Sequence, residues 1–209
     1  MRVVVAGGHG QIGLRLLRLL ADGGHEPVGL IRKAEQAGDI REVGAEPLVL
    51  DLEAADDVSL DADAVVFAAG AGPGSGAQRK WTMDYGGAVK LLAPAKLDGI
   101  SRYVMVSSRG ADPDAPGDDT FAVYLRAKGK ADDDLRASGL DYTIIRPGAL
   151  TNEAGTGSVA LTEHGERGQI PRDDVAAVIA AVLSAPNTIG KTLDLISGDV
   201  PVEEAVEAA

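Results

Sequence analysis

Short runs of apolar residues recur along the chain of 209 residues, and amphipathic stretches separate them. The runs consist of consecutive Val, Ile, Leu and Ala and do not alternate with polar residues. Continuous apolar runs are typical of strands in a sheet whose two faces are both covered. The pattern therefore predicts buried strands at residues 2–6, 27–31, 47–50, 64–68, 103–107, 142–146 and 192–196.

The amphipathic stretches predict helices between these strands. The helix after the first strand ends at two glycines, and its predicted apolar stripe consists of Ile12, Leu16, Leu19 and Leu20. A late helix follows Pro171, and Asp173 or Asp174 could accept hydrogen bonds from its first turn. Residues 200–209 form either a short helix or a frayed end. After the first helix, the remaining ones are expected at about residues 34–43, 78–97, 119–138 and 173–183.

Strands that alternate with helices indicate βαβ units, and hence an α/β fold with a doubly wound parallel sheet, the Rossmann fold. The length fits one domain over residues 1–209. Only about 60 residues follow the sixth strand, so the C-terminal substrate region is small. Loops that follow the carboxyl ends of parallel strands border the ligand crevice of such a sheet. The loops expected there are residues 70–76, 109–119 and 151–158.

The composition narrows the class of protein. Hydrophobic residues make up 45% of the chain and charged residues 25%, as in soluble globular proteins. The formal net charge of −12, with no evident basic patch, argues against nucleic acid as a partner. The absence of cysteine excludes disulfides, thiolate metal ligands and a cysteine nucleophile. No apolar run approaches the roughly 18 residues that span a bilayer, and no signal peptide is recognisable, so we expect a cytoplasmic protein without a membrane partner.

The stretch VVVAGGHGQIG runs from a strand through four glycines into a helix. Gly8, Gly10 and Gly13 form G-x-G-x-x-G, whereas Gly7, Gly10 and Gly13 form G-x-x-G-x-x-G, and both patterns predict the same chemistry. Glycine permits a tight turn with positive φ, and the missing Cβ lets a pyrophosphate approach the N–H groups at the positive end of the helix. The residues expected to bind a dinucleotide here are Gly7, Gly10, Gln11, Ile12 and Gly13.

The end of the second predicted strand bears on which dinucleotide binds. NAD sites place a carboxylate there, but this chain has Arg32 and Lys33 and no acidic residue before Glu35. A guanidinium can bind a 2′-phosphate with two parallel hydrogen bonds, and an adjacent ammonium adds charge. The two residues therefore favour NADP over NAD, although basic residues also begin ordinary solvated helices.

Two later strand ends fit the same cofactor. Asp51, followed by Leu52, could accept a hydrogen bond from the adenine amine, and the small residues Ala68, Ala69 and Gly70 leave room for the adenosine. Both features also have an ordinary interpretation, because Asp often caps helices and small residues often occur in turns.

Tyr124 and Lys128 are four residues apart on a predicted helix and therefore lie on one face. An adjacent ammonium favours the phenolate of a tyrosine and makes proton transfer easier at neutral pH. Ser107 or Ser108, at the end of the preceding strand, would hold a substrate carbonyl oxygen next to the phenol, and Lys128 would also reach the nicotinamide ribose. The alternative is a surface tyrosine packed along the stem of an exposed lysine.

With these residues in place, the chain resembles the short-chain dehydrogenase/reductase superfamily, in its atypical NAD(P)H-binding branch of small single-domain proteins with NmrA-like and flavin-reductase-like members. The resemblance covers nearly the whole chain and lies in VAGGHGQIG, VFAAGAG, RYVMVSS, YLRAK, SGLDYTIIRPGAL and GQIPRDDVAAVIAAVL. It implies that Gly7, Gly10 and Gly13 bind the pyrophosphate, Arg32 the 2′-phosphate, and that Tyr124, Lys128 and Ser108 or Ser107 are catalytic.

Two further features follow from the resemblance. It places the backbone of Pro147 and Gly148 near the nicotinamide amide. Many superfamily members carry an Asn in the fourth helix that relays protons, whereas this chain offers Asp84 nearby, which is a departure from the pattern.

The combined expectation is an NADP(H)-binding oxidoreductase that transfers a hydride to a small carbonyl, quinone or flavin-like substrate. The alternatives are a non-catalytic NAD(P)H-binding redox sensor and a sugar-epimerase-like protein, and a homo-oligomer is possible. Residues 70–82, 109–120 and 149–170 would contact the substrate, with Trp81 and Phe121 as the chief aromatic residues. His9 and His164 have no second ligand beside them, so no metal site is expected.

Overall fold

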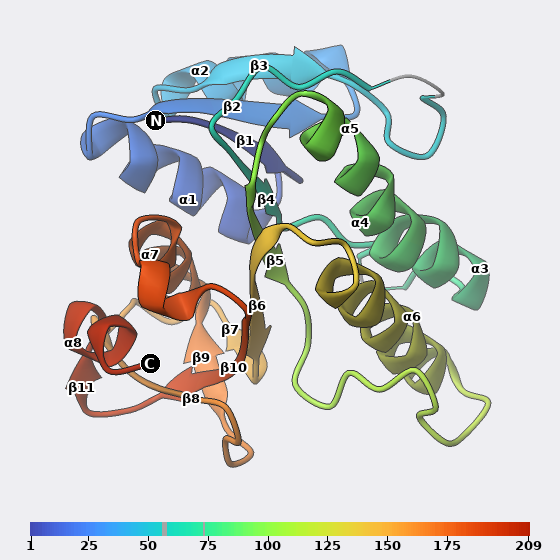
Figure 1. Cartoon of the computed structure of the whole chain (residues 1–209), viewed down its shortest axis with the longest axis vertical. Helices are drawn as coiled ribbons and strands as arrows, with labels where there is room; N and C mark the ends of the chain where they lie inside the picture. The colour runs from blue at the N-terminus through green and yellow to red at the C-terminus, as the bar shows by residue number, and fades with distance from the viewer. Residues whose placement is uncertain (56–57, 73) are drawn as a thin grey trace.

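The computed structural model describes residues 1–55, 58–72 and 74–209, which form a twisted sheet with helices on both faces (Figure 1). The strand order is β11-β8-β10-β6-β5-β4-β1-β2-β3. The strands predicted from the sequence all form within one residue of their expected ends and run parallel. They are β1 (Arg2–Ala6), β2 (Glu26–Ile31), β3 (Glu46–Val49), β4 (Ala64–Phe67), β5 (Arg102–Val106), β6 (Asp141–Pro147) and β10 (Lys191–Ser197).

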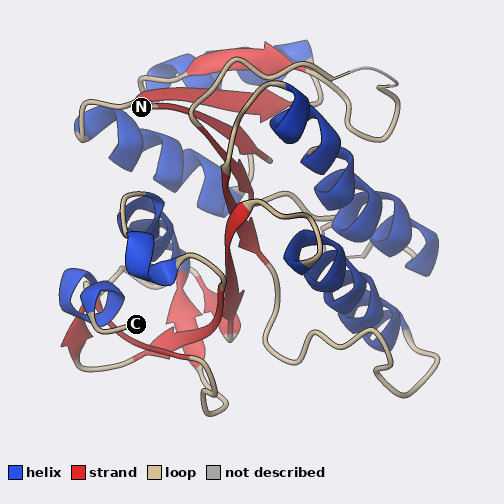
Figure 2. Cartoon of the chain, viewed as in Figure 1, coloured by secondary structure: helices blue, strands red, loops and turns tan. Residues whose placement is uncertain are grey.

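The helices lie in two layers that sandwich the sheet (Figure 2). One layer contains α1 (Gln11–Asp22), α2 (Ala37–Glu42), α7 (Arg172–Leu183) and α8 (Val202–Glu207). The other contains α4 (Gly86–Lys90), α5 (Leu92–Leu97) and α6 (Thr120–Arg136). Short turns accompany them, namely η1 (Ala34–Gln36), α3 (Ala77–Arg79), the π-helical turn η2 (Lys80–Tyr85) and η3 (Pro186–Thr188).

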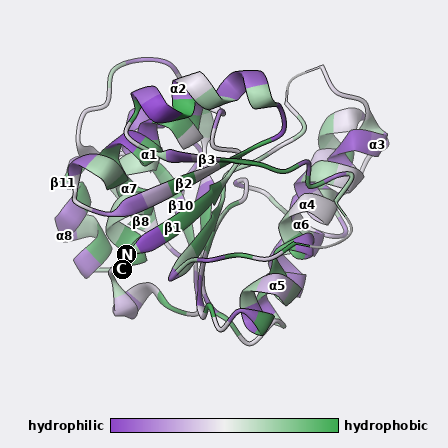
Figure 3. Ribbon diagram, turned by 90° about the horizontal axis from the view of Figure 1, so that it is seen from above, coloured by the Kyte–Doolittle hydropathy of each residue, from purple (hydrophilic) through white to green (hydrophobic). Residues whose placement is uncertain are grey.

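Strand β1 shows why the central strands are continuously apolar. Val3 and Val5 belong to the core beneath α1 and α7, whereas Val4 and Ala6 belong to the core beneath α4 and α6. Successive side chains of a strand point to opposite faces, so both sets must be apolar when both faces are buried. The apolar strands run through the middle of the molecule, between helices with hydrophilic outer faces (Figure 3). The single α/β domain of Rossmann type follows from this arrangement.

Additional strands at the C-terminal edge were missed by the sequence prediction. β8 (Ser158–Thr162) is antiparallel to β10, and β11 (Val200–Pro201) is antiparallel to β8. β7 (Ala149–Thr151) and β9 (Gln169–Pro171) form a separate parallel pair. In β8 only Val159 and Leu161 are buried, because edge strands bury one face and show alternation rather than a continuous run.

The predicted helix over residues 78–97 is interrupted. It consists of α3, η2, α4 and α5 in succession. Pro94 lacks the N–H group that would bond to the carbonyl of Lys90, and the chain turns at Leu91 between α4 and α5. The helix expected over residues 34–43 likewise begins as the 3-10 turn η1 before α2.

Two details of the predicted helices were wrong. In α1 the buried stripe contains Leu17 in place of Leu19, which is 41% exposed. At the start of α7, Asp173 and Asp174 do not cap the helix and instead accept hydrogen bonds from backbone N–H groups of residues 155–157. These bonds hold the loop between β7 and β8 against α7. The tail forms the helix α8.

The loop over residues 109–119 packs on α6. A Cβ atom on Gly129 would lie 2.3 Å from the backbone nitrogen of Pro113, so the backbone of the loop packs directly against the backbone of α6 at this glycine. Arg126 donates hydrogen bonds to the carbonyls of Ala115 and Gly117 at 2.7 and 2.6 Å. The loop is therefore anchored beside the carboxyl end of β5. In the loop over residues 70–76, Pro73 lies outside the described residues.

Candidate functional site

The glycine turn between β1 and α1 is closely packed on two sides. Gly7 has a φ of +84°, and a Cβ atom on it would lie 2.7 Å from the backbone of Ala69 after β4. A Cβ atom on Gly13 would lie 2.2 Å from the carbonyl oxygen of Gly7. Any side chain at these two positions would fill the space in which the turn meets the helix and the neighbouring strand end. The residues present thus fit the bare-backbone cradle that a pyrophosphate requires.

Gly8 has a different role from Gly7. It adopts no positive φ, and a Cβ atom on it would lie 2.8 Å from the Cα atom of Gly29 in β2. Its N–H group donates to the carbonyl of Leu30 at 3.0 Å. The geometry therefore favours the pattern with Gly7, Gly10 and Gly13, and Gly8 packs the turn against β2.

A cavity of about 270 Å³ lies beside this turn, at the carboxyl ends of β1, β2 and β3. Arg32 and Asp51 contribute to its wall, together with the backbone of Gly7. The other residues around it are His9, Gly10, Leu30, Ile31, Gln36, Leu50, Leu52, Ala68, Ala69, Gly70, Arg79 and Met83. The sequence predicted four cofactor-binding residues after β2 and β3. Arg32, Asp51 and Leu52 line this cavity, and Lys33 does not.

Two arginines and one glutamate form a charged cluster at this cavity. Glu53 accepts from Nε and Nη2 of Arg79 at 3.2 and 3.0 Å and lies 3.9 Å from Arg32. The hydroxyl of Thr82 donates to its second oxygen at 2.6 Å. Burial alone would raise the pKa of Glu53, but these hydrogen bonds and the two positive charges outweigh burial and lower it. Arg32 and Arg79 thus meet around one carboxylate.

His9 connects the glycine turn to the segment after β2. Its Nε2 lies 2.5 Å from a carboxylate oxygen of Asp39, and its Nδ1 lies 3.1 Å from the side-chain nitrogen of Gln36. Gln36 in turn accepts from the N–H group of Lys33 at 3.2 Å. The histidine therefore holds two loops together. Among the described residues there is no group of three or more His, Cys, Asp or Glu side chains suited to hold a metal ion.

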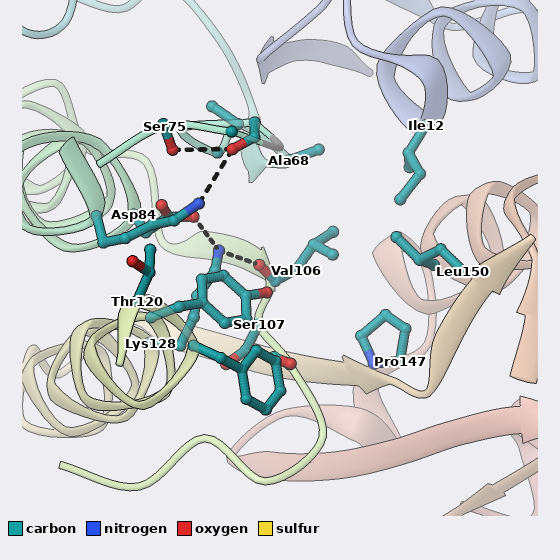
Figure 4. Close-up of a pocket in the computed structure, with 18 of the residues that line it drawn as sticks. Ile12, Ala68, Ser75, Asp84, Val106, Ser107, Thr120, Lys128, Pro147 and Leu150 are labelled. Atoms are coloured by element: carbon teal, nitrogen blue, oxygen red, sulfur yellow. Dashed lines mark hydrogen bonds and ion pairs between the residues drawn. The ribbon is translucent and has the colours of Figure 1, made fainter. Parts of the chain in front are cut away.

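A larger cavity of about 790 Å³ begins where the first one ends, because Ala68, Ala69 and Gly70 line both. It extends along the carboxyl ends of β4, β5 and β6 toward β7 (Figure 4). Of the predicted site residues, it brings together Ile12, Ser107, Ser108, Tyr124, Lys128 and Pro147. The two cavities form one groove across the point where the strand order reverses, which is where open α/β sheets bind ligands.

Lys128 is buried, and its ammonium lies next to two acceptor groups. It is 3% exposed, its ammonium lies 3.7 Å from Asp84, which is 2% exposed, and it donates to the carbonyl of Val106 at 3.0 Å. Figure 4 shows the Lys128 ammonium between these two groups. Asp84 also accepts from the N–H group of Ala71 at 3.2 Å. A buried ammonium needs such a carboxylate, so Asp84 is the charge partner of Lys128.

Tyr124 lies on the wall of the larger cavity, half-buried, and has two aromatic or cationic neighbours. Its ring stacks on Phe121 with a centroid distance of 6.0 Å, and the ammonium of Lys80 lies 5.4 Å from the ring centroid. Phe121 also lines the cavity and is 65% exposed. Trp81, the other aromatic residue expected near the substrate, packs edge-on against Tyr85 instead.

Ser107, one of the catalytic candidates, lies near a buried ion pair formed by Asp132 and Arg146. Ser107 is 4% exposed, and within the described chain its hydroxyl has no hydrogen-bond partner of regular geometry. Asp132 is fully buried and pairs with Arg146 at 2.7 Å. Burial raises the pKa of Asp132, although Arg146 and the nearby Ser107 hydroxyl lower it in part. Ser107 therefore lies between the cavity that it lines and the buried pair of Asp132 and Arg146.

Some predicted residues lie outside both cavities. Gln11 is exposed at the start of α1, Gly13 is buried beneath the turn, and Lys33 pairs with Glu35 at 3.5 Å. Ser75, Lys80 and Thr120 in the larger cavity fall within the segments expected to contact the substrate, whereas Gln36, Arg79 and Met83 were not predicted as residues of the smaller cavity. These last three lie on segments whose course depends on the interrupted helix and the loops, and no local pattern marks them.

The chain matches the family model described as NAD(P)H-binding over residues 7–186. An uncharacterized sugar epimerase named YhfK, from Bacillus subtilis (strain 168), is 40% identical over 212 residues, which is 99% of both chains. No helix among the described residues is long and apolar enough to cross a membrane.

Solved structures agree with these matches. A protein from Bacillus halodurans, provisionally named an NAD-dependent epimerase/dehydratase, superposes with a TM-score of 0.94 at 45% identity over 100% of both chains. The anaerobillin reductase ChuY from Escherichia coli O157:H7 superposes with a TM-score of 0.79 at 28% identity, over 96% of this chain and 98% of that one.

Proposed function

The chain belongs to the NAD(P)H-binding family, and from this premise we propose that it is an NADP(H)-dependent oxidoreductase of the atypical short-chain dehydrogenase/reductase type. Its proposed substrate is a small carbonyl, quinone or flavin-like compound. One observation carries the proposal: a continuous groove joins the glycine turn to a cavity lined by Ser107, Tyr124 and Lys128. The continuous groove would let one ligand reach from the glycine turn to these catalytic candidates.

The preference for NADP rests on Arg32. Its side chain is 46% exposed, lines the smaller cavity and touches Glu53 only at 3.9 Å. The guanidinium therefore retains its planar set of N–H donors for a 2′-phosphate. Lys33 pairs with Glu35 outside the cavity, and we assign it no direct contact with the cofactor.

When bound, a nicotinamide cofactor supplies a hydride to the substrate carbon. In the proposal, the hydroxyl of Tyr124 donates a proton to the substrate oxygen, and solvent returns it. The hydroxyl of Ser107 or Ser108 holds that oxygen in place. Lys128, fixed between Asp84 and the carbonyl of Val106, contributes positive charge beneath the site.

The lining of the larger cavity supports a planar, weakly polar substrate. Phe121 and Tyr124 stack on one side of the cavity, and Pro147 and Leu150 also line it. Within the described part of this lining, Asp84 and Lys128 form a buried ion pair whose charges balance, and Lys80 over the Tyr124 ring adds one positive charge. The reductase name of ChuY points in the same direction.

The test is reduction of defined substrates. Purified protein is mixed with NADPH and a panel of carbonyls, quinones and free flavin, and the loss of cofactor absorbance is recorded. We expect turnover with at least one compound and a loss of at least about 100-fold in Tyr124→Phe, because general acid catalysis contributes about 10²–10⁴-fold. Binding of NADPH without turnover would favour the redox-sensor alternative, and an unchanged rate in Tyr124→Phe would remove this residue from the mechanism.

The cofactor preference has its own test. We expect Arg32→Ala to weaken NADPH binding at least about tenfold more than NADH binding, because hydrogen bonds to charged groups contribute about 1.5–3 kcal/mol. Calorimetric titration of both nucleotides measures the two losses. Equal losses would contradict a contact between Arg32 and the 2′-phosphate.

The name of YhfK favours sugar epimerisation as a second candidate, and the name of the Bacillus halodurans protein also includes an epimerase. Epimerisation returns the hydride, so it predicts interconversion of nucleotide sugars without net change in NADP⁺. Chromatography of nucleotide sugars incubated with the protein and NADP⁺ distinguishes the two candidates.

A further inference from the structure

We infer that Arg79 is an adenine-binding residue of the cofactor groove and that Glu53 holds its guanidinium in the orientation that adenine needs. The inference rests on the proposed binding of an adenine dinucleotide. It depends neither on the preference for NADP nor on catalysis. Neither residue belongs to the glycine turn or to the pair at the end of β2.

Arg79 lines the smaller cavity from a different segment of the chain than the glycine turn. It lies in α3, beyond the carboxyl end of β4, whereas Gly7 and Arg32 lie at the ends of β1 and β2. Asp51, expected at the adenine amine, lines the same cavity, as do the apolar side chains of Leu52 and Met83. A flat apolar base edged by one carboxylate fits these surroundings.

The hydrogen bonds of Arg79 determine what it can offer a ligand. Within the described part of the chain, Nε and Nη2 donate to Glu53 at 3.2 and 3.0 Å, and Nη1 donates to the carbonyl of Ala71 at 3.1 Å. These bonds use three of the five N–H groups of the guanidinium and lie in its plane. The Nε–Nη2 edge and one N–H group of Nη1 are therefore anchored to protein, which restrains the orientation of the plane and lets it present its flat face to a ligand.

Arg32 provides the contrast within the same cavity. It touches the same carboxylate only at 3.9 Å and is 46% exposed, compared with 36% for the side chain of Arg79. Arg32 can therefore turn its donor edge to a phosphate, while the plane of Arg79 is restrained by its bonds to Glu53 and to the carbonyl of Ala71. The flat face of a guanidinium stacks favourably on aromatic rings. This division assigns the phosphate to Arg32 and the base to Arg79.

Glu53 is the positioning residue in this arrangement. Its side chain is 23% exposed, does not line the cavity, and is itself held by the hydroxyl of Thr82 at 2.6 Å. One oxygen of the Glu53 carboxylate is held by Thr82 and the other accepts from Arg79, so Glu53 restrains Arg79 before any ligand binds. Restraint in the bound orientation lowers the entropy lost on binding.

The experiment compares nucleotide affinities by calorimetry for the whole protein and three variants. The probes are NADPH, NADH and nicotinamide mononucleotide, which lacks adenine. In Arg79→Ala we expect both dinucleotides to bind about tenfold more weakly, by the same factor, since stacking of a cation on an aromatic ring contributes about 0.5–2 kcal/mol. Binding of nicotinamide mononucleotide should not change.

Two further variants test whether the planar shape of the Arg79 side chain matters as well as its charge, and whether Glu53 positions it. Arg79→Lys keeps the positive charge and loses the plane, so its affinities should fall nearly as far as those of Arg79→Ala. Glu53→Gln should weaken both dinucleotides by a smaller common factor, because Arg79 is held less firmly. Circular dichroism checks that each variant is folded.

Several results would overturn the inference. A loss confined to NADPH in Arg79→Ala would make Arg79 a phosphate ligand, and wild-type affinity in Arg79→Lys would show that charge alone matters. Unchanged affinities in Glu53→Gln would remove its positioning role. If the unaltered protein bound neither dinucleotide, the proposed function would fail together with this inference.

Discussion

Gly13 offers a sharp test of the glycine turn. A Cβ atom at this position would lie 2.2 Å from the carbonyl oxygen of Gly7 and 2.9 Å from that of Gly8. Both contacts are to backbone, which cannot rotate away as a side chain can. The substitution Gly13→Ala therefore forces the turn and α1 apart by about 1 Å before ordinary van der Waals contact is reached.

The expected free-energy change combines two effects of opposite sign. Alanine is favoured over glycine inside a helix by about 1 kcal/mol. Overpacking in a close-packed region costs about 1–3 kcal/mol. We expect Gly13→Ala to lower the free energy of unfolding by up to about 2 kcal/mol. We also expect it to weaken NADPH binding at least about tenfold, because the phosphate-binding N–H groups move with the turn.

Gly38 supplies the matched control. It also lies in a helix, α2, and a Cβ atom on it would meet nothing within 4 Å. Gly38→Ala should keep or raise the free energy of unfolding, by up to about 1 kcal/mol, and leave NADPH binding unchanged. Urea denaturation measures the stabilities, and calorimetric titration measures the affinities. Equal unfolding free energies for the two variants, with unchanged NADPH affinity in Gly13→Ala, would refute the assigned role of the turn.

Three further predictions concern buried and charged groups. Asp84→Asn leaves the ammonium of Lys128 without a carboxylate in a buried site. It should therefore lower the free energy of unfolding, measured by urea titration, by about 3–5 kcal/mol. A loss below about 1 kcal/mol would contradict the pairing of Asp84 with Lys128. The folded state lowers the pKa of Glu53, so the stability that it contributes is present above its usual value near 4.3 and is lost as the pH falls through the lowered value. The stability difference between the wild type and Glu53→Gln should therefore shrink as the pH falls through this range, and a difference that grows would contradict the sign. Gly129→Ala places a Cβ atom 2.3 Å from the nitrogen of Pro113 and should lower the melting temperature, in contrast to Gly38→Ala.

The strands and the glycine turn could be predicted because their causes are local. A strand buried on both faces must be apolar at every position, as Val3, Val4 and Val5 are. A strand-to-helix turn of the dinucleotide-binding kind needs glycines at set spacings, because its backbone packs closely and must leave room for a pyrophosphate. The topology of parallel strands then brings the ends of β1, β4, β5 and β6 to one edge of the sheet. The two cavities lie where this edge predicts them.

The interrupted helix after β4 could not be predicted from periodicity. Apolar residues recur through residues 78–97 as in one helix, but the π-helical turn η2 adds an extra residue to the turn that carries Asp84. That turn directs Asp84 toward Lys128, and α3 before it carries Arg79 to the smaller cavity. Such contacts depend on how three separate elements pack, and no local sequence pattern encodes them.

The two lysines near Tyr124 show the limit of spacing arguments. Four residues on a helix bring the Cβ atoms of Tyr124 and Lys128 to the same face, as expected. The long side chain of Lys128 nevertheless ends at Asp84, because a buried ammonium is stable only beside a carboxylate or comparable acceptors. The ammonium that lies over the ring of Tyr124 belongs to Lys80, which is remote in sequence. A proton-transfer role for Tyr124 must therefore take both lysines into account. Replacing Lys80 by Met tests how much the ammonium over the ring contributes to proton transfer by Tyr124, a contribution that the sequence did not indicate.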